Sequence, residues 1–558
     1  MERIWLQSYP HGIPADLPEP EFESLAAFAD EACRHHAART AFISMGRQMN
    51  YAELDRLSRD FAAWLQSRGI GKGERIALMM PNILQYPVCL LGALRAGCIV
   101  VNCNPLYTAE ELEHQLKDSG AVAIVVLENF AHTVQAAAPG SNLRHIVVTA
   151  LGDLLGPLRG TLTNFVVRHV KKLVPRWALP GAAALNSALS AGASAPFAAV
   201  PLNREDIAFL QYTGGTTGIS KGAMLSHGNM LANVAQAGLW IGHLVHGEDE
   251  TVVTAIPLYH IFALTANCLT FLHLGAANLL IANPRDIGGF IKELKRHPFT
   301  ALTGVNTLFN GLLHHPEFER LDFSKLHLTL GGGMAVLPTV AERWQTVTGK
   351  PLAQAYGLTE TSPAVTINPL DQPYNRSIGL PIPSTEISIR DDAGHEVTLG
   401  QVGELCVRGP QVMKGYWQRP DETQNVMFAD GFLRTGDLGY VDEKGYVFLV
   451  DRKKDMILVS GFNVYPNEVE AVLTSHRGVL EAAVIGVSDE HSGEVVKAFI
   501  VRRDPQLTAE SLIEHCREHL SAYKIPKHVE FRDNLPKTNV GKILRRALKD
   551  EVAAKNKA

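Results

Sequence analysis

Periodic apolar positions alternate with short apolar runs along the first third of the chain. Apolar residues recur at helical spacing over residues 26–35, 51–68, 85–96 and 110–117. Runs typical of buried strands lie between and after them, at residues 75–79, 99–102, 121–127 and 145–149. Alternation of helix and strand favours a layered α/β domain around a largely parallel sheet. We therefore predict an α/β fold for this part of the chain.

The pattern changes twice further along. After a helix expected over residues 226–241 and further strands, residues 365–445 show short strands between Gly and Pro turns, which is typical of a β-rich subdomain. The charged segment 451–455 then separates two apolar strands, and the remaining residues show a small α+β pattern that is long enough to fold as a unit. We predict an N-terminal domain of residues 1–450, a connection at 451–455 and a C-terminal domain of residues 456–558.

Composition narrows the classes of protein that fit. A chain of 558 residues exceeds the size at which one hydrophobic core stops growing, which also indicates two or more domains. A net charge of −5 and a pI near 6.5 give no reason to expect nucleic acid as a partner. The N-terminus lacks the apolar segment of a secretory signal, and the seven cysteines are scattered. Reduced thiols in the cytoplasm fit that distribution better than disulfides.

Two segments raise the question of a membrane. Residues 264–282 are apolar enough to resemble a spanning helix, but Asn267, His273 and Gly275 favour a buried helix, a turn at Gly275 and a buried strand. Residues 161–177 form an amphipathic segment that carries Arg168, Lys171, Lys172 and Arg176. Such a segment is suited to a membrane surface, and it is equally suited to a solvated helix on an insertion.

The segment Tyr212–Gly222 has the composition of a phosphate-binding loop. Its glycines let the backbone approach an anion closely, its threonines add hydroxyl donors, and Lys221 adds a positive charge. The order Ser220-Lys221-Gly222 differs from the Gly-Lys-Ser/Thr order of the nucleotide kinases and ATPases. A flexible turn without a ligand is the alternative interpretation.

Five segments together resemble the adenylate-forming ligase superfamily. They are residues 212–222, 356–361, 434–437, 451–455 and 536–542, and they occur in the order and spacing of that superfamily along nearly the whole chain. The run from 430–437 through 451–455 to 460–466 further resembles the signature of the bacterial long-chain fatty acyl-CoA synthetases. Phe432 and Arg434 stand where many relatives carry Trp and His, and we expect them to tune packing near the ribose without changing the reaction.

The resemblance implies a fold and a reaction. The expected fold is a large N-terminal domain of layered α/β subdomains plus a β-rich subdomain, with a small mobile α+β C-terminal domain that rotates about a hinge at 451–455. The expected reaction activates a long-chain fatty acid with ATP to an acyl-AMP, releases pyrophosphate, and transfers the acyl group to CoA. Mg²⁺ is the expected metal, because hard cations prefer oxygen ligands and phosphates.

The resemblance also assigns roles to individual residues. Lys542 is the expected catalytic residue of adenylation, and Lys454 the hinge residue. His260 matches a residue near the acyl carboxylate and the CoA path, although a lone His beside apolar residues is more often a core histidine. Residues 261–272 and 305–313 are expected to form the acyl tunnel. The expected metal ligands are Thr213 and Glu360. The expected nucleotide-binding residues are Thr213, Gly214, Gly215, Thr216, Thr217, Gly218, Lys221, Gly332, Gly333, Ala355, Tyr356, Gly357, Thr359, Asp437, Arg452 and Asn463.

Two other functions remain open at this point. An adenylating enzyme that loads a carrier protein, or that acts on aromatic or small acids, shares most of these motifs. A non-catalytic acyl or nucleotide sensor on a membrane shares some of them. The expected partners are a long-chain fatty acid, ATP and CoA, with peripheral attachment to the cytoplasmic face of the inner membrane and a homodimer as further expectations.

Overall fold

The computed structural model describes residues 2–557 apart from 214–219, 246–248, 490–491 and 539–540. Within it, a seven-stranded sheet forms the first layer of the N-terminal domain, in the order β7-β6-β5-β3-β4-β8-β9. All its pairings are parallel except the β8–β9 hairpin. The strands are β3 (Arg75–Met79), β4 (Ile99–Asn102), β5 (Ala123–Leu127), β6 (His145–Thr149), β7 (Ala183–Ala184), β8 (Ile207–Thr213) and β9 (Lys221–Ser226).

Helices cover both faces of this sheet, which explains its continuous apolar runs. In β3, Ile76 and Leu78 belong to the core shared with α2 and α3, whereas Ala77 and Met79 belong to the core shared with α4 and α5. Neither face of the strand can therefore be polar. The helices around this sheet are α2 (Tyr51–Ser67), α3 (Gln85–Arg95), α4 (Ala109–Ser119), α5 (Ala131–Ala137) and α7 (Leu185–Ala193).

A nine-stranded sheet forms the second layer, in the order β16-β15-β14-β13-β12-β10-β11-β1-β2. Its strands are β1 (Thr40–Ser44), β2 (Arg47–Asn50), β10 (Thr251–Thr254), β11 (Ala277–Leu280), β12 (Ala301–Gly304), β13 (Leu328–Gly331), β14 (Ala353–Gly357), β15 (Ala364–Ile367) and β16 (Leu380–Pro381). The associated helices are α1 (Leu25–His35), α8 (His227–Ile241), the π-helix Ala263–Leu269, α9 (Thr270–His273), α10 (Ile287–Arg296), α11 (Asn306–Leu313) and α12 (Pro338–Thr348). Their apolar sides complete the core of this layer.

The apolar window 264–282 is a buried helix, a turn and a buried strand, as its composition predicts. The helical part ends at His273, Gly275 has a positive φ of 70°, and β11 begins at Ala277. Within the described part of the chain, none of the helices combines the length and the apolar character that crossing a bilayer demands.

A four-stranded antiparallel sheet of β17 (Glu386–Arg390), β18 (Gly403–Arg408), β19 (Leu433–Val441) and β20 (Val447–Arg452) follows, with α13 (Pro420–Val426) beside it.

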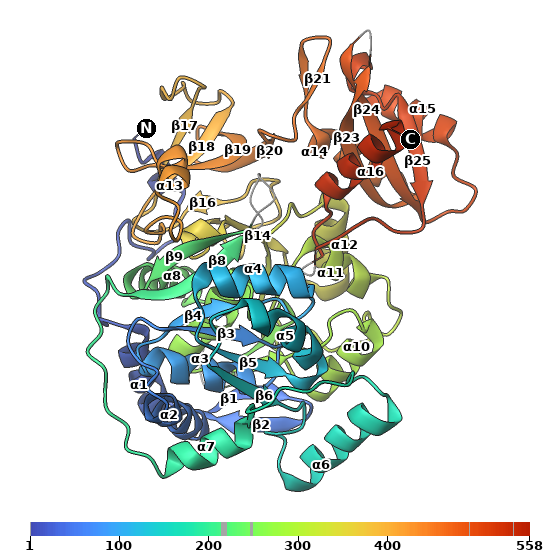
Figure 1. Ribbon diagram of the computed structural model, residues 1–558. Helices are drawn as coiled ribbons and strands as arrows, with labels where there is room; N and C mark the ends of the chain where they lie inside the picture. Colours follow the sequence, from blue (N-terminus) through green and yellow to red (C-terminus); the bar gives the residue numbers. More distant parts are fainter. Residues whose placement is uncertain (1, 214–219, 246–248, 490–491, 539–540, 558) are drawn as a thin grey trace.

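The small C-terminal domain has its own five-stranded sheet and its own cores. Its elements are β21 (Ile457–Val459), β22 (Phe462–Val464), α14 (Pro466–Ser475), β23 (Val479–Asp489), β24 (Gly493–Arg502), α15 (Ala509–His519), β25 (His528–Arg532) and α16 (Arg545–Lys557). The predicted α/β fold with a β-rich part and a small α+β domain is confirmed. Figure 1 shows the C-terminal domain at one end of the molecule, while α6 (Pro157–Phe165) projects from the opposite end.

Candidate active site

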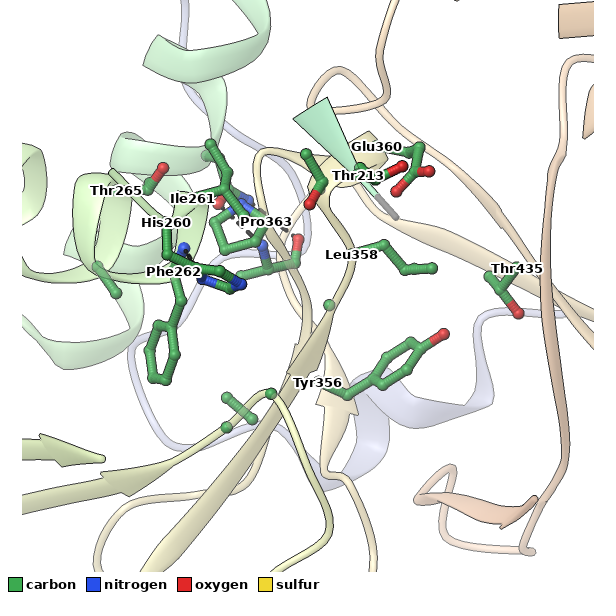
Figure 2. Close-up of a pocket in the computed structure, with 18 of the residues that line it drawn as sticks. Thr213, His260, Ile261, Phe262, Thr265, Tyr356, Leu358, Glu360, Pro363 and Thr435 are labelled. Atoms are coloured by element: carbon green, nitrogen blue, oxygen red, sulfur yellow. Dashed lines mark hydrogen bonds between the residues drawn. The ribbon is translucent and has the colours of Figure 1, made fainter. Parts of the chain in front are cut away.

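A cavity of about 660 Å³ lies where the two α/β layers, the antiparallel sheet and the C-terminal domain meet. Strand ends β8, β9, β13 and β14 contribute to it, and so do α8, β19 and the segment after β20. Ligands of open α/β sheets commonly bind at the carboxyl ends of strands, because loops from several strands converge there. In Figure 2, His260 and Phe262 lie on one side of this pocket and Tyr356 and Thr435 on the other.

Both described ends of the glycine-rich loop face the cavity. Thr213 and Lys221 are direct partners in the register of the β8–β9 hairpin, and both line the pocket. The Lys221 ammonium donates to the Glu422 carboxylate at 2.6 Å and lies 5.3 Å from the centre of the Tyr416 ring. Gly214, Gly215, Thr216, Thr217 and Gly218 lie outside the described residues.

Glu360 lies near the same loop, on the 3-10 helix Thr359–Thr361, which contacts β8 and β9. The Tyr416 hydroxyl donates to Glu360 Oε1 at 2.7 Å, and the Glu360 carbonyl accepts from the backbone N–H of Met413 at 2.8 Å. The carboxylate is therefore held toward the pocket, where Figure 2 shows Thr213 and Glu360 at the same end. Hydroxyl and carboxylate oxygens of this kind fit a hard divalent cation.

Tyr356, Asp437 and Arg452 form a connected group on the other side of the pocket. The Tyr356 hydroxyl donates to Asp437 Oδ2 at 2.6 Å, and Arg452 Nε pairs with Asp437 Oδ1 at 2.9 Å. Burial and the Asp437 charge raise the pKa of Tyr356 well above its ordinary value, so the hydroxyl keeps its proton. Gly332 packs directly on the Phe262 ring, since a Cβ there would come within 3.0 Å of it. The Tyr356 side of the pocket therefore presents an aromatic ring beside a carboxylate, which is a hydrogen-bond acceptor.

Lys542 enters the cavity from the C-terminal domain. The Thr538 N–H donates to the Lys542 carbonyl at 2.7 Å. Gly541 has a positive φ of 87°, and its carbonyl accepts from the Thr307 hydroxyl at 3.3 Å. A Cβ at Gly541 would come within 2.5 Å of that hydroxyl oxygen, so glycine permits this approach. Desolvation and the nearby Arg452 charge lower the pKa of the Lys542 ammonium to about 8.

A cluster of buried and half-buried charges connects the segment 451–455 to the C-terminal domain. Arg545, at the start of α16, pairs with Glu470 at 2.7 Å, with Asp451 at 3.3 Å and with Asp455 at 3.5 Å. Asp451 Oδ2 also accepts from the backbone N–H of Asn467 at 2.7 Å. Asp451 lies in β20 of the antiparallel sheet, whereas Asn467, Glu470 and Arg545 belong to the C-terminal domain. These contacts therefore link the antiparallel sheet to the C-terminal domain.

His260 begins the helical turn that leads into the π-helix. Its Nδ1 accepts from the Phe262 N–H at 3.3 Å, so a neutral ring carries its proton on Nε2. Desolvation, with a smaller effect from Lys542, lowers the pKa of His260 to about 4. The ring is therefore a neutral N–H donor at physiological pH.

Beyond His260 the cavity becomes mainly apolar. Phe262, Ala266 and Phe271 line it from the π-helix region, Ala237 and Ile241 from α8, and Leu328 and Leu330 from β13. A π-helical segment widens a helix locally and is often found at functional sites. The predicted tunnel region 261–272 therefore borders the cavity, whereas Val305 alone of the described residues 305–313 is a lining residue.

The cavity brings together most of the residues singled out from the sequence. Its lining includes Thr213, Lys221, His260, Gly332, Gly333, Ala355, Tyr356, Gly357, Thr359, Glu360, Arg452, Lys454 and Lys542. Asp437 adjoins it through Tyr356, while Asn463 is exposed on β22 and is not among the lining residues. Sequence reasoning missed Tyr416 and Glu422. Lys221 and Glu422 are 201 positions apart, so no spacing pattern could pair them.

The chain resembles known proteins over its full length. It matches the AMP-binding enzyme family over residues 29–417 and the AMP-binding enzyme C-terminal domain over residues 468–542. It is 56% identical to a long-chain-fatty-acid–CoA ligase of Salmonella typhimurium, covering 100% of both chains. It is 37% identical to a protein of the same name from Bacillus subtilis, covering 99% of this chain and 98% of that one. Among solved structures, the anthranilate CoA ligase AuaEII in complex with anthranoyl-AMP superposes with a TM-score of 0.84 at 26% identity, covering 96% and 99% of the two chains.

Proposed function

The chain belongs to the AMP-binding enzyme family, and from that premise we propose that it is a long-chain-fatty-acid–CoA ligase. The proposed reaction joins a fatty acid carboxylate to the α-phosphate of ATP with loss of pyrophosphate. The CoA thiol then attacks the acyl-AMP, and AMP leaves. One observation carries this proposal: a single cavity joins a polar end, bordered by Thr213, Lys221 and Lys542, to an apolar chamber beyond His260.

The polar end is suited to the phosphates of ATP. We propose that the loop from Thr213 to Lys221 holds the leaving pyrophosphate and that Thr359 contacts phosphate. The Lys221 ammonium is paired with Glu422, so phosphate binding would exchange that partner for a more highly charged one. Charge that develops at phosphate oxygens is stabilised best by donors that are already oriented.

The nucleoside would bind along the wall formed by Tyr356. Tyr356 would stack on the adenine, with Gly332, Gly333, Ala355 and Gly357 giving the base close approach. Asp437 would accept the ribose hydroxyls. Because Tyr356 and Arg452 already occupy both Asp437 oxygens, ribose binding would have to displace or share one of them. Asn463 stays a prediction from the sequence.

Thr213 and Glu360 would hold Mg²⁺. The orienting hydrogen bond from Tyr416 to Glu360 supports this role. A bound Mg²⁺ supplies positive charge to the phosphates of ATP. The protein groups themselves orient the nucleotide and, with Lys542, neutralise the charge that builds in adenylation.

Lys542 would act in the first step and withdraw for the second. We propose that residues 1–450 form the fixed half of the site, that the C-terminal domain (456–558) rotates about 451–455, and that Lys454 is the turning point. In the first step, neutral His260 could donate its Nε2–H to the carboxylate of the fatty acid. Lys542→Ala should abolish acyl-AMP formation but leave thioester formation from supplied acyl-AMP nearly unchanged. Equal loss in both half-reactions would contradict this division of labour.

A panel of acids tests the proposed substrate class. Pyrophosphate release should depend on long-chain fatty acids, and acyl-CoA should form when CoA is added. Aromatic or short acids should react at least tenfold more slowly, because each buried methylene contributes about 0.8 kcal/mol. Preference for an aromatic acid, or transfer to a carrier protein in place of CoA, would favour the alternative adenylating enzymes.

We also propose peripheral attachment to a membrane through α6 and the π-helix Val166–Val170. Gly152 and Gly160 pack closely where this helical segment meets the rest of the domain, since a Cβ on either glycine would come within 2.3 Å of the other's carbonyl oxygen. Leu158 is 89% exposed, Leu162 64% and Phe165 54%. Large apolar side chains beside basic ones suit an interface with anionic lipid.

Sedimentation with vesicles containing anionic lipid tests this attachment. The double variant Leu158→Ser and Leu162→Ser should stay in the supernatant at vesicle concentrations that sediment the wild-type protein. A matched control is Leu399→Ser, an exposed leucine elsewhere on the surface. Equal sedimentation of all three proteins would remove the proposal without affecting the proposed reaction.

A further inference from the structure

One face of α15 carries three potential metal ligands at its C-terminal end, in the C-terminal domain. His515, Glu518 and His519 occupy positions i, i+3 and i+4, which lie on the same side of a helix. One ligand atom from each lies within 4.8 Å of the others, and this is the one such group found among the residues that the structure describes. The group belongs to neither the cavity nor the segment 451–455.

Hydrogen bonds fix the ring of His515 and its tautomer. His515 Nε2 lies 3.1 Å from the Val472 carbonyl, which can only accept, so Nε2 carries the proton. Ser475 Oγ donates its own hydrogen to the same carbonyl at 2.7 Å and lies 3.0 Å from Nε2. The lone pair of a neutral ring is therefore on Nδ1. A metal-binding histidine commonly donates its second nitrogen to a carbonyl in this way, which orients the ring before the ion arrives.

The surroundings favour a cation and add a further imidazole. His476 packs edge-on against His515 with ring centres 5.2 Å apart, and the His515 and His519 rings are 4.8 Å apart. The nearby Arg517 is paired with Glu514 at 2.7 Å. The group also occupies the last turn of α15, where the helix dipole favours positive charge.

We propose that His515, Glu518 and His519 form a binding site for a divalent transition-metal ion of the Zn²⁺ type. Two imidazoles and one carboxylate suit Zn²⁺, Ni²⁺ or Cu²⁺, whereas Mg²⁺ and Ca²⁺ prefer oxygen ligands alone. The order His-x-x-Glu-His also binds zinc through its two histidines in one class of zinc peptidases. Here a bound ion would stabilise the last turn of α15, where His515 already contacts Val472 and Ser475 of α14. The site is separate from the Mg²⁺ ligands proposed above.

Zinc titration of the untagged full-length protein in buffer with excess Mg²⁺ tests this site. We expect calorimetry to detect one Zn²⁺ per chain with micromolar or tighter affinity, and bound Co²⁺ to show a visible d–d absorption band. His519→Ala should weaken Zn²⁺ binding at least tenfold and remove the Co²⁺ band. Glu518→Gln should weaken binding less, because both imidazoles remain.

His528→Ala is the matched control, since His528 is an exposed histidine on the same domain. This variant should bind Zn²⁺ like the wild-type protein. Equal Zn²⁺ affinity in wild type and His519→Ala, or binding only at millimolar Zn²⁺, would overturn the proposal. Acyl-AMP formation should be unchanged in His519→Ala, so a failure of the zinc site is distinguishable from a failure of the proposed reaction.

Discussion

The pKa of Lys542 gives the most specific prediction about the chemistry. A lysine with a pKa of about 8 is mostly charged at pH 7 and mostly neutral at pH 9. Its pKa is lowered from the ordinary value because desolvation and Arg452 disfavour the charged form. If the charged form acts in adenylation, the second-order rate constant for ATP in the first turnover without CoA should fall about tenfold per pH unit above pH 8.

The magnitude of the effect follows from the charge itself. A positive charge about 4 Å from one negative charge, at an effective dielectric constant near 20, contributes roughly 4 kcal/mol. That energy corresponds to a rate effect on the order of a thousandfold. Bound MgATP remains anionic and raises the pKa of Lys542, so the first-turnover rate at saturating ATP should begin to fall at higher pH than the second-order rate constant does.

The assay is first-turnover release of pyrophosphate with saturating fatty acid. CoA is left out, so that its thiol does not contribute to the pH profile. Lys542→Arg should lose the decline between pH 8 and 9, because a guanidinium stays charged, although its activity at pH 7 should be lower. Lys537→Arg is the matched control, since Lys537 lies on the same segment and pairs with Glu481 at 2.6 Å. A flat wild-type profile, or the same decline in Lys542→Arg, would contradict a role for the charged Lys542 side chain in adenylation.

Three further substitutions test separate parts of the site. Arg545→Lys weakens the contacts to Asp451 and Glu470. It should lower acyl-AMP formation at least tenfold but change thioester formation from supplied acyl-AMP less than threefold. Equal loss in both half-reactions would contradict a role for Arg545 in holding the C-terminal domain against the N-terminal domain. Tyr416→Phe removes the hydrogen bond to Glu360, so the Mg²⁺ concentration for half-maximal activity should rise about two- to tenfold, the range expected for one hydrogen bond. Ala237→Phe narrows the apolar chamber and should shift the preferred acid in a chain-length series to shorter chains; an unchanged preference with unchanged Tm would exclude this part of the cavity from acyl binding.

The fold was predictable where both faces of a strand are buried. Residues 76–79 of the first predicted strand and the whole predicted run 121–127 are apolar, because helices cover both sides of their sheet. The C-terminal helix α16 escaped prediction, since it is rich in charged residues and has little apolar periodicity. Its one fully buried leucine, Leu548, packs against the far side of the C-terminal sheet.

The candidate site was predictable as a set of motifs but not as a set of contacts. The motif residues Thr213, Tyr356 and Lys542 do line one cavity. The partners that orient such groups, such as Tyr416 and Arg545, come from distant positions, and only the folded chain brings them together. The lowered pKa of Lys542 likewise depends on desolvation and on charges from another domain, which no local pattern encodes.

The most direct test of the proposed two-step reaction is a rapid-quench experiment on the wild-type protein. Enzyme mixed with a long-chain fatty acid and MgATP, without CoA, should release about one pyrophosphate per active site and retain one acyl-AMP. CoA added afterwards should convert that acyl-AMP to acyl-CoA and release AMP. Release of ADP and phosphate, or no pyrophosphate until CoA is present, would contradict it.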